Sequence, residues 1–171
     1  GNSIQSGGRN GEIAAESLSS SLGKLGLKTG RMKTGTPPRI NFHSLDFDKL
    51  QPQYGDENPQ PFSFDTDKIE CEQLPCYLTY TNHRTHKIIR SNLHRAPMFN
   101  GQIESAGPRY CPSIEDKVVR FAEKAGHRIF LEPEGLDDDT VYPNGISTSL
   151  PEEVQELLLH TIPGLETVRM I

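Results

Sequence analysis

The sequence predicts an α/β protein, in which helices and strands follow one another along a single chain. Apolar residues recur at helical spacing in several stretches, and short runs rich in β-branched and aromatic residues lie between them. Thirteen prolines and 15 glycines separate these stretches and predict many turns. No internal repeat is present. The alternation favours the α/β class and leaves an α+β arrangement open.

The first predicted helix follows a glycine-rich turn and carries an apolar face at Ile13, Leu18 and Leu22. We expect Gly23 or Gly26 to end it, because glycine readily adopts the left-handed conformation found just after helices. A short strand is expected to close at Met32, and the glycine and prolines of residues 35–38 then predict a loop.

The middle of the chain has a weaker pattern that still predicts a strand and a helix. Residues 41–67 are rich in proline and polar residues, and we expect an ordered excursion anchored by Phe62 and Phe64. Residues 76–81 alternate and predict a strand. A helix follows with Thr85 as its N-cap and an apolar face at Ile88, Ile89 and Leu93. A short strand is expected near residues 102–105.

The last third of the chain predicts two helices around two strand segments. The first helix begins near residue 113, ends at Gly126, and has an apolar stripe at Ile114, Val118, Phe121 and Ala125. Residues 128–133 predict a strand, and Asn144-Gly145 suits the two-residue turn of a hairpin. Ser149 and Glu152 have capping-box spacing at the start of the last helix, with Pro151 in its first turn and core positions at Val154, Leu157, Leu158 and Ile162.

Composition restricts the class of protein. Hydrophobic residues make up 33% of the 171 residues, tryptophan is absent, and the mean hydropathy is −0.59, so we expect a fragment that shares its core with more chain. The net charge of −5 gives no support for bulk nucleic-acid affinity. Three irregularly spaced cysteines do not form a disulfide framework and favour a reducing cytoplasm. No run reaches membrane-spanning length, and we expect a soluble protein.

Cys111 is the residue most open to a chemical role. It lies in "GPRYCPSIEDKVVRF", where Pro112 suits the first helical position and Ser113 suits a cap, so the thiol precedes a helix. Unpaired N–H groups at a helix start, together with Arg109, favour a reactive thiolate. The alternative is a buried structural cysteine. The same segment could bind an anion through Gly107, Arg109 and Lys117, although no phosphate-loop motif is present.

A local basic stretch lies between Glu72 and Glu104, where no acidic residue occurs. Its charged residues, and three aromatic residues that could stack on bases, predict a nucleic-acid surface: Arg84, Lys87, Arg90, Arg95, His83, His86, His94, Tyr77, Tyr80 and Phe99. A solvated helix face is the alternative. A zinc site at Cys71, Cys76, His83 and His86 fits the usual ligand spacings poorly, so no metal is predicted.

Several long strings together resemble one family: "SGGRNGE", "GRMKTGTPPRI", "TNHRTHKIIRSNL", "GPRYCPSIEDKVVRF", "FLEPEG" and "YPNGISTSLP". Across essentially the whole chain, the sequence is similar to the MnmG (GidA) family of tRNA-modifying flavoenzymes, and it resembles an internal fragment of them. The resemblance implies part of a Rossmann-like FAD-binding domain at residues 1–35, an α/β insertion domain at residues 36–106, and a return to the FAD-binding domain at residues 107–171.

The resemblance also implies cofactors, and a site for each. FAD and NADH are the implied redox cofactors, and methylenetetrahydrofolate is the implied one-carbon donor. The family's FAD contact, commonly a serine, matches Ala15 here. Cys111 matches a cysteine implicated in catalysis. The nicotinamide-associated motif matches residues that we expect to bind cofactor: Gly107, Pro108, Arg109, Tyr110, Pro112, Ser113, Ile114, Glu115, Asp116, Lys117 and Phe121.

The implied reaction installs the carboxymethylaminomethyl group at C5 of the wobble uridine of certain tRNAs. The implied partners are tRNA and the MnmE GTPase, with a homodimer inside a heterotetramer, in the cytoplasm or alternatively the mitochondrial matrix. Cys111 could add to C6 of the uridine, or it could act directly in flavin-mediated transfer. The competing interpretation is a noncatalytic RNA-binding or zinc-stabilised module.

Overall fold

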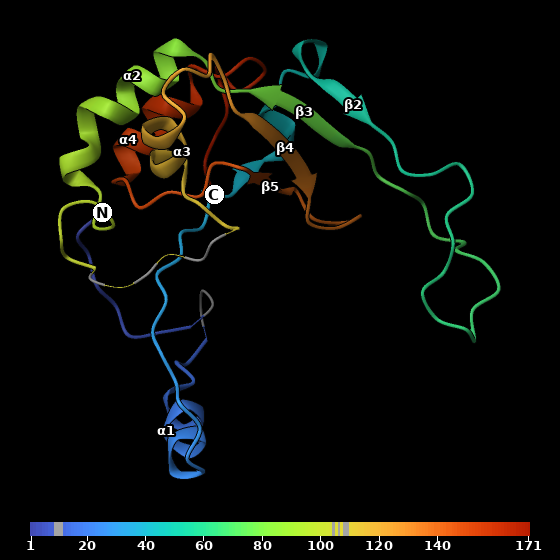
Figure 1. Ribbon diagram of the computed structural model, residues 1–171. Coiled ribbons are helices and arrows are strands. Elements are labelled where there is room, and N and C mark those ends of the chain that lie inside the picture. Colours follow the sequence, from blue (N-terminus) through green and yellow to red (C-terminus); the bar gives the residue numbers. More distant parts are fainter. Residues whose placement is uncertain (9–11, 104, 106, 108–109) are drawn as a thin grey trace.

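A five-stranded antiparallel sheet, with three helices beside it, forms the body of the molecule (Figure 1). The computed structural model describes residues 1–8, 12–103, 105, 107 and 110–171. Its helices and strands are α1 (Glu16–Lys24), β1 (Ile40–Asn41), β2 (Gln51–Gln53), β3 (Cys76–Tyr80), α2 (His83–Asn92), α3 (Ile114–Arg120), β4 (Arg128–Pro133), β5 (Thr140–Asn144) and α4 (Glu152–Leu159), with short 3₁₀ turns at Phe42–Ser44, Phe47–Lys49 and Leu93–Arg95.

The strand order is β1-β5-β4-β3-β2, and every described pair is antiparallel. The predicted combination of helices and strands, an α/β fold, is confirmed. The antiparallel pairing of its sheet agrees with the α+β arrangement that the sequence left open. Side chains alternate across the sheet, so the paired residues Thr79 and Ile129 are both buried while Tyr80 and Arg128 are exposed. One face of the sheet is therefore part of the core.

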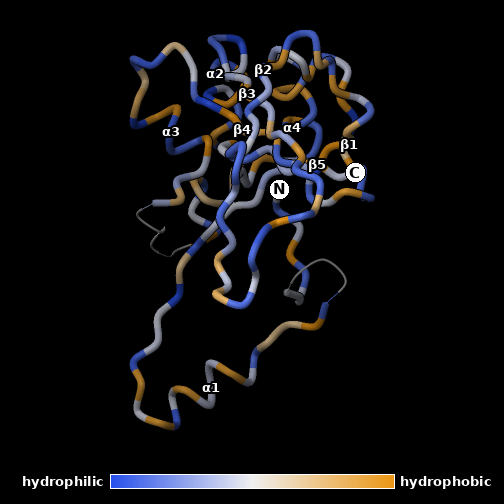
Figure 2. Tube along the Cα trace, turned by 90° about the vertical axis from the view of Figure 1, so that its right-hand side faces the viewer, coloured by the Kyte–Doolittle hydropathy of each residue, from blue (hydrophilic) through white to orange (hydrophobic). Residues whose placement is uncertain are grey.

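The helices α2, α3 and α4 pack together over the buried face (Figure 1). Fully buried residues from each helix meet residues of the strands in one cluster, which includes Ile89, Ile114, Leu158, Leu131 and Ile40. Figure 2 shows hydrophobic segments gathered where these helices meet the sheet, and others along α1, away from the body. A single core thus joins residues 40–170.

The start of α2 differs from the prediction in its cap. Asn82 is the N-cap, and its side chain accepts hydrogen bonds from the backbone N–H groups of Arg84 and Thr85. Thr85, predicted as the cap, is instead the third helical residue and accepts from the backbone N–H of Asn82 through its hydroxyl. Both residues therefore belong to one capping box, with asparagine in the leading position.

The helices α3 and α4 begin near their predicted positions but differ in detail. Helix α3 ends at Arg120, so Phe121 and Ala125 lie beyond it and are exposed. Ser149 does not cap α4, because its backbone N–H and hydroxyl both donate to Glu115, and the N-cap is Pro151. Leu157, which was predicted to face the core, is 58% exposed. Leu159 is buried, although it was not predicted as a core residue.

Three expectations about the first half of the chain are wrong in their packing. Helix α1 forms, but it has no buried residue, and its predicted apolar face is open to solvent. The long β2–β3 loop extends away from the body (Figure 1), and Phe62 and Phe64 are fully exposed and anchor nothing. Within the described ranges, Met32 forms an isolated bridge and no strand.

Two smaller elements also differ. The described residues among 102–105 form bends and no strand. The predicted hairpin is built differently, because β5 pairs with β4 through a turn at residues 134–139, and Gly145 ends β5 with a positive φ of 110°. A Cβ at Gly145 would lie 2.7 Å from the carbonyl oxygen of Arg128, so this position requires glycine.

The sheet crosses the expected domain limits. Strand β3 comes from residues 36–106 and β4 from residues 107–171, and the two pair over four residues of each. The two ranges therefore share one sheet and one core in this chain. None of the helices in the described part of the chain is long and apolar enough to cross a membrane.

Candidate active site

Cys111 lies at the surface, just before α3. Ser113 is the N-cap of that helix, and its hydroxyl accepts a hydrogen bond from the backbone N–H of Asp116. The predicted cap is therefore confirmed, and it places the thiol two residues before it. Cys111 is exposed, so the alternative of a buried structural cysteine is wrong. Exposure makes the sulfur accessible to a reactant.

A cavity of about 300 Å³ surrounds the thiol and brings together distant parts of the sequence. Its lining comes from the segment before β1, the α2–α3 connection and α3 itself: Lys33, Met98, Ser105, Gly107, Cys111, Pro112, Asp116 and Arg120. The volume lies at the lower end of the range for small-molecule sites, about 300–1,000 Å³. The cavity is thus large enough for one small reactant beside the sulfur.

The charged side chains of this cavity, which we term the Cys111 pocket, are two cations and one carboxylate. Asp116 accepts from the hydroxyl of Ser113 at 3.3 Å and lies 3.7 Å from the guanidinium of Arg120. Lys33 donates from Nζ to the carbonyl oxygen of Met98 at 3.0 Å. Lys33 forms no ion pair within 4 Å among the described residues, whereas Asp116 lies against Arg120.

Lys117 does not line the pocket, and its side chain reaches the backbone at the end of β5. Its Nζ donates to the carbonyl oxygen of Gly145 at 2.8 Å. Burial lowers the pKa of this amine, and the nearby Cys111 opposes that effect. Lys117 therefore ties α3 to the end of β5 and lies within electrostatic range of the thiol, whereas the sequence predicted that it would reach toward an anion.

The predicted cofactor-binding residues divide into three groups. Gly107, Pro112 and Asp116 line the pocket, and Tyr110 and Phe121 are exposed near it in sequence. Ser113, Ile114 and Glu115 are fully buried. Pro108 and Arg109 lie outside the described residues. The structure therefore brings only part of the predicted motif to the cavity surface.

Glu115 is the buried acidic residue of this motif, and its carboxylate forms hydrogen bonds inside the fold. One carboxylate oxygen accepts from the hydroxyl of Thr148 at 2.8 Å and from the backbone N–H of Ser149 at 2.9 Å. The other oxygen is buried and has no partner within the described part of the chain. Glu115 thus joins α3 to the segment that leads into α4.

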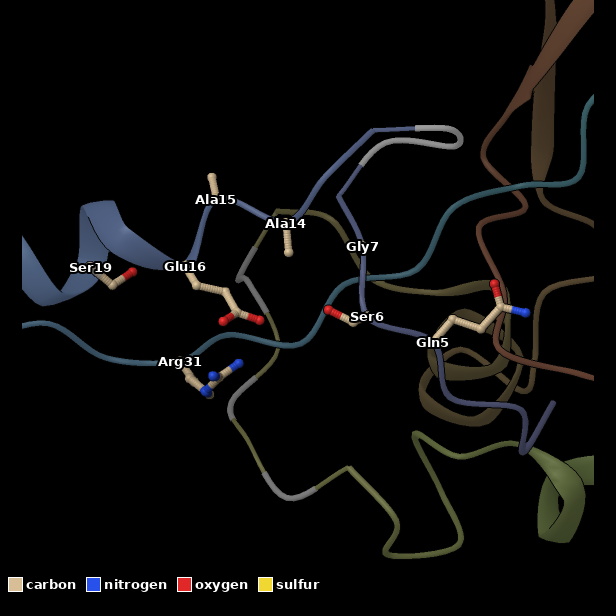
Figure 3. Close-up of a pocket in the computed structure, with 8 residues that line it drawn as sticks. All are labelled: Gln5, Ser6, Gly7, Ala14, Ala15, Glu16, Ser19 and Arg31. Atoms are coloured by element: carbon tan, nitrogen blue, oxygen red, sulfur yellow. The ribbon is translucent and has the colours of Figure 1, made fainter.

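Ala15 lies in a different cavity, of about 590 Å³, at the start of α1 (Figure 3). Its lining residues are Gln5, Ser6, Gly7, Ala14, Ala15, Glu16, Ser19 and Arg31. The side chains of Glu16 and Arg31 extend toward the same space in Figure 3. None of these residues also lines the Cys111 pocket, so the two predicted site regions are separate in the described chain.

The basic stretch forms one exposed face of α2. Arg84, Lys87 and Arg90 are exposed there, and none of them has a carboxylate within 4 Å among the described residues. Arg95 differs, because it pairs with Glu153. Of the aromatic residues predicted to stack on bases, Tyr80 and Phe99 are 45% and 38% exposed. Tyr77 instead packs against Phe47 with a centroid separation of 4.9 Å.

His86 is not part of that surface. It is fully buried against His127, which the sequence did not single out, at a ring-centroid separation of 5.2 Å. Cys71 is exposed on the β2–β3 loop, and burial raises the pKa of Cys76 in β3. No group of three or more possible metal ligands occurs in the described ranges.

Sequence reasoning also missed Lys33. It lies in the loop string "RMKTGTPPRI", where no periodic pattern points to a role. Only the folded chain brings it to the Cys111 pocket. The signal that could have found it is its place inside one of the long strings that carry the family resemblance.

The fold and the site together define a class of protein: an α/β protein with an exposed cysteine in a charged cavity. This chain belongs to the family described as "Glucose inhibited division protein A", which it matches over residues 1–171. It is 56% identical over 96% of its length to "tRNA uridine 5-carboxymethylaminomethyl modification enzyme MnmG" of Syntrophotalea carbinolica, and 56% identical over 97% to the protein of that name from Bacillus licheniformis. The chain spans about 27% and 26% of those relatives.

Solved structures agree with the family assignment. The chain aligns over its whole length with Aquifex aeolicus GidA in two crystal forms, with TM-scores of 0.85 and 0.83 and sequence identities of 49% and 47%. It covers 30% and 28% of those chains. The predicted family and the predicted fold class are therefore both confirmed.

Proposed function

We propose that the protein carrying this chain installs the carboxymethylaminomethyl group at C5 of the tRNA wobble uridine. The observation that carries the proposal is the exposed thiol of Cys111 in a charged cavity, within a chain more than half identical to enzymes named for that modification. An RNA-binding or zinc-stabilised module without catalysis is not favoured, because it gives no role to this pocket.

Cys111 acts as a nucleophile in this proposal. As a thiolate, Sγ adds to C6 of the uridine, and the electrons of the C5–C6 double bond pass to C5. C5 then attacks the carbon of an iminium formed from the one-carbon unit and the incoming amine, and the π electrons of its C=N bond move to the nitrogen. Loss of the C5 proton and departure of the thiolate restore the ring. The rival role, a direct part in flavin-mediated transfer, uses the same accessible sulfur.

The residues at the start of α1 fit one end of FAD. The cavity there contains the guanidinium of Arg31 and lies at the N-terminal end of a nine-residue helix, two features that suit a diphosphate, while the carboxylate of Glu16 in the same lining opposes it. Ala15 has no side-chain hydrogen bond to offer, so its position contributes only backbone. FAD would supply redox equivalents, and NADH would reduce it. Of the predicted NADH contacts, Gly107, Pro112 and Asp116 line the Cys111 pocket, and Tyr110 and Phe121 are exposed near it in sequence.

The exposed face of α2 supplies the proposed tRNA contact. Three unpaired cations project from one helix of an otherwise acidic chain, and phosphates are the groups that such a face attracts. Tyr80 and Phe99 keep partly exposed rings available for stacking. The MnmE GTPase, the heterotetramer and methylenetetrahydrofolate stay predictions, which light scattering of the purified complex and an assay with each one-carbon donor can test.

The test is complementation with the complete gene. A bacterial strain that lacks its own enzyme receives the wild-type gene or an empty vector, and the wobble nucleoside of its tRNA is measured by mass spectrometry. We expect the modified nucleoside only with the gene. Failure to restore it, together with stoichiometric zinc in the purified protein, would favour the noncatalytic module instead.

A further inference from the structure

We propose that Lys33 makes the Cys111 pocket an anion-binding subsite and holds a nucleotide phosphate beside the reacting thiol. The inference rests on the proposed function for the identity of the nucleotide. Its basis in the structure is the cavity that Lys33 and Cys111 share, although they are far apart in the sequence.

The ammonium of Lys33 is held in place and still has donors to spare. Its hydrogen bond to the carbonyl of Met98 uses one of three N–H groups. Met98 is itself 8% exposed, and its backbone N–H donates to the hydroxyl of Ser149, so the anchor is part of the core. The remaining donors of Lys33 are available at the pocket, where the side chain is half-buried.

The charges around the pocket favour an anion. Lys33 and Arg120 line it, whereas Asp116 is the single carboxylate among the described lining residues. Lys117 adds a positive charge within electrostatic range of the thiol. The hydroxyl of Ser113 and the guanidinium of Arg120 both engage Asp116. A phosphate that entered would therefore meet the unmatched charge of Lys33.

The first experiment measures the anion preference directly and needs no substrate. The complete protein is alkylated with iodoacetate, an anion, and with iodoacetamide, its neutral analogue, and each cysteine is quantified by mass spectrometry. Lys33→Met should lower the iodoacetate-to-iodoacetamide ratio at Cys111 about two- to fivefold, in line with a surface charge interaction, and Lys33→Arg should preserve it. Cys71, exposed between Glu70 and Glu72, is the internal control and should not change.

The second experiment identifies the source of the phosphate. Steady-state kinetics of Lys33→Met should show a raised KM for tRNA if the RNA supplies it, or for NADH if the cofactor does, with kcat changed less. An unchanged alkylation ratio at Cys111, or an unchanged KM for both, would overturn the inference. If the wild-type enzyme modified no tRNA, the proposed function would be wrong, and the alkylation ratio would still decide whether Lys33 binds anions.

Discussion

The hydroxyl oxygen of Thr81 lies 2.7 Å from Nε2 of His86 and also accepts a hydrogen bond from the backbone N–H of His127 at 2.8 Å. The hydroxyl keeps its own proton for Nε2 of His86, and burial of that ring lowers its pKa and favours the neutral imidazole. The buried ring of His127 lies against it, and its Nε2 has no partner in the described part of the chain. The pair thus fastens α2 to the start of β4 in a neutral state.

The first prediction is that stability falls as the pH falls below about 6.5, the ordinary pKa of histidine. Burial lowers the pKa of both His86 and His127, and the nearby cations Arg90, Lys117 and Lys124 add to this, while Glu123 opposes it. The unfolded chain therefore binds protons first, and the stability present above pH 6.5 is lost as the pH falls through the folded-state values.

Thermal unfolding of the complete protein between pH 7.5 and 5.5 checks this. His127→Phe should flatten the pH dependence, while His94→Gln, on the exposed side, should leave it as in the wild type. A melting temperature that rises on acidification would contradict the neutral pair.

The second prediction concerns Glu115. Glu115→Ala should lower the free energy of unfolding by about 1–3 kcal/mol, because Thr148 and the backbone N–H of Ser149 lose their acceptor inside the core. Glu115→Gln keeps an acceptor oxygen and should cost less. Denaturant unfolding provides the measurement, with the exposed Glu123→Ala as control. Equal midpoints for Glu115→Ala and wild type would show that the carboxylate is not a structural link.

The third prediction concerns Gly126, which lies beside the corner between β3 and α2. A Cβ at this position would lie 2.4 Å from the carbonyl oxygen of Thr81, so Gly126→Ala must move backbone and should destabilise by about 1–3 kcal/mol. Gly55→Ala is the matched control, because nothing lies within 4 Å of its Cβ and it should be neutral. Similar melting temperatures for the two variants would argue against this close approach.

The fourth prediction concerns tRNA affinity. Replacing Arg84, Lys87 and Arg90 together with alanine should weaken binding and reduce the salt slope of log K by about 2–3, since each phosphate contact contributes about 0.7–0.9. Lys49→Ala is the control, because that lysine already pairs with Asp46 and Glu166. Filter binding across a salt series measures both. An unchanged slope in the triple variant would remove α2 from the RNA interface.

Local sequence signals predicted the elements that depend on local interactions. The strand at β3 and the helix start at Ser113 follow from β-propensity and from a capping side chain within a few residues. Helix α2 was predicted as well, but its cap is Asn82 and not Thr85. The failures are tertiary. Phe62 and the apolar face of α1 have the pattern of buried residues, but the described chain offers them nothing to pack against.

The site was predicted in part for the same reason. The position of Cys111 before a helix could be derived from Pro112 and Ser113, and the family resemblance supplied its chemical interest. Its neighbour Lys33 could not be derived, because only the packing of the loop before β1 against the α2–α3 connection creates that proximity. Similarly, the burial of Glu115 and His86 depends on distant segments. The sequence therefore wrongly predicted that both side chains would be accessible to a ligand.

The most direct test of the account compares two cysteines in the purified complete enzyme. Wild type, Cys111→Ser and Cys71→Ser are assayed for modification of a target tRNA, with the product nucleoside quantified by mass spectrometry. Cys111→Ser should lose at least about a hundredfold in rate, the scale expected when a nucleophile is removed, and Cys71→Ser should match the wild type. Normal modification by Cys111→Ser would contradict the central claim that this thiol takes part in the reaction.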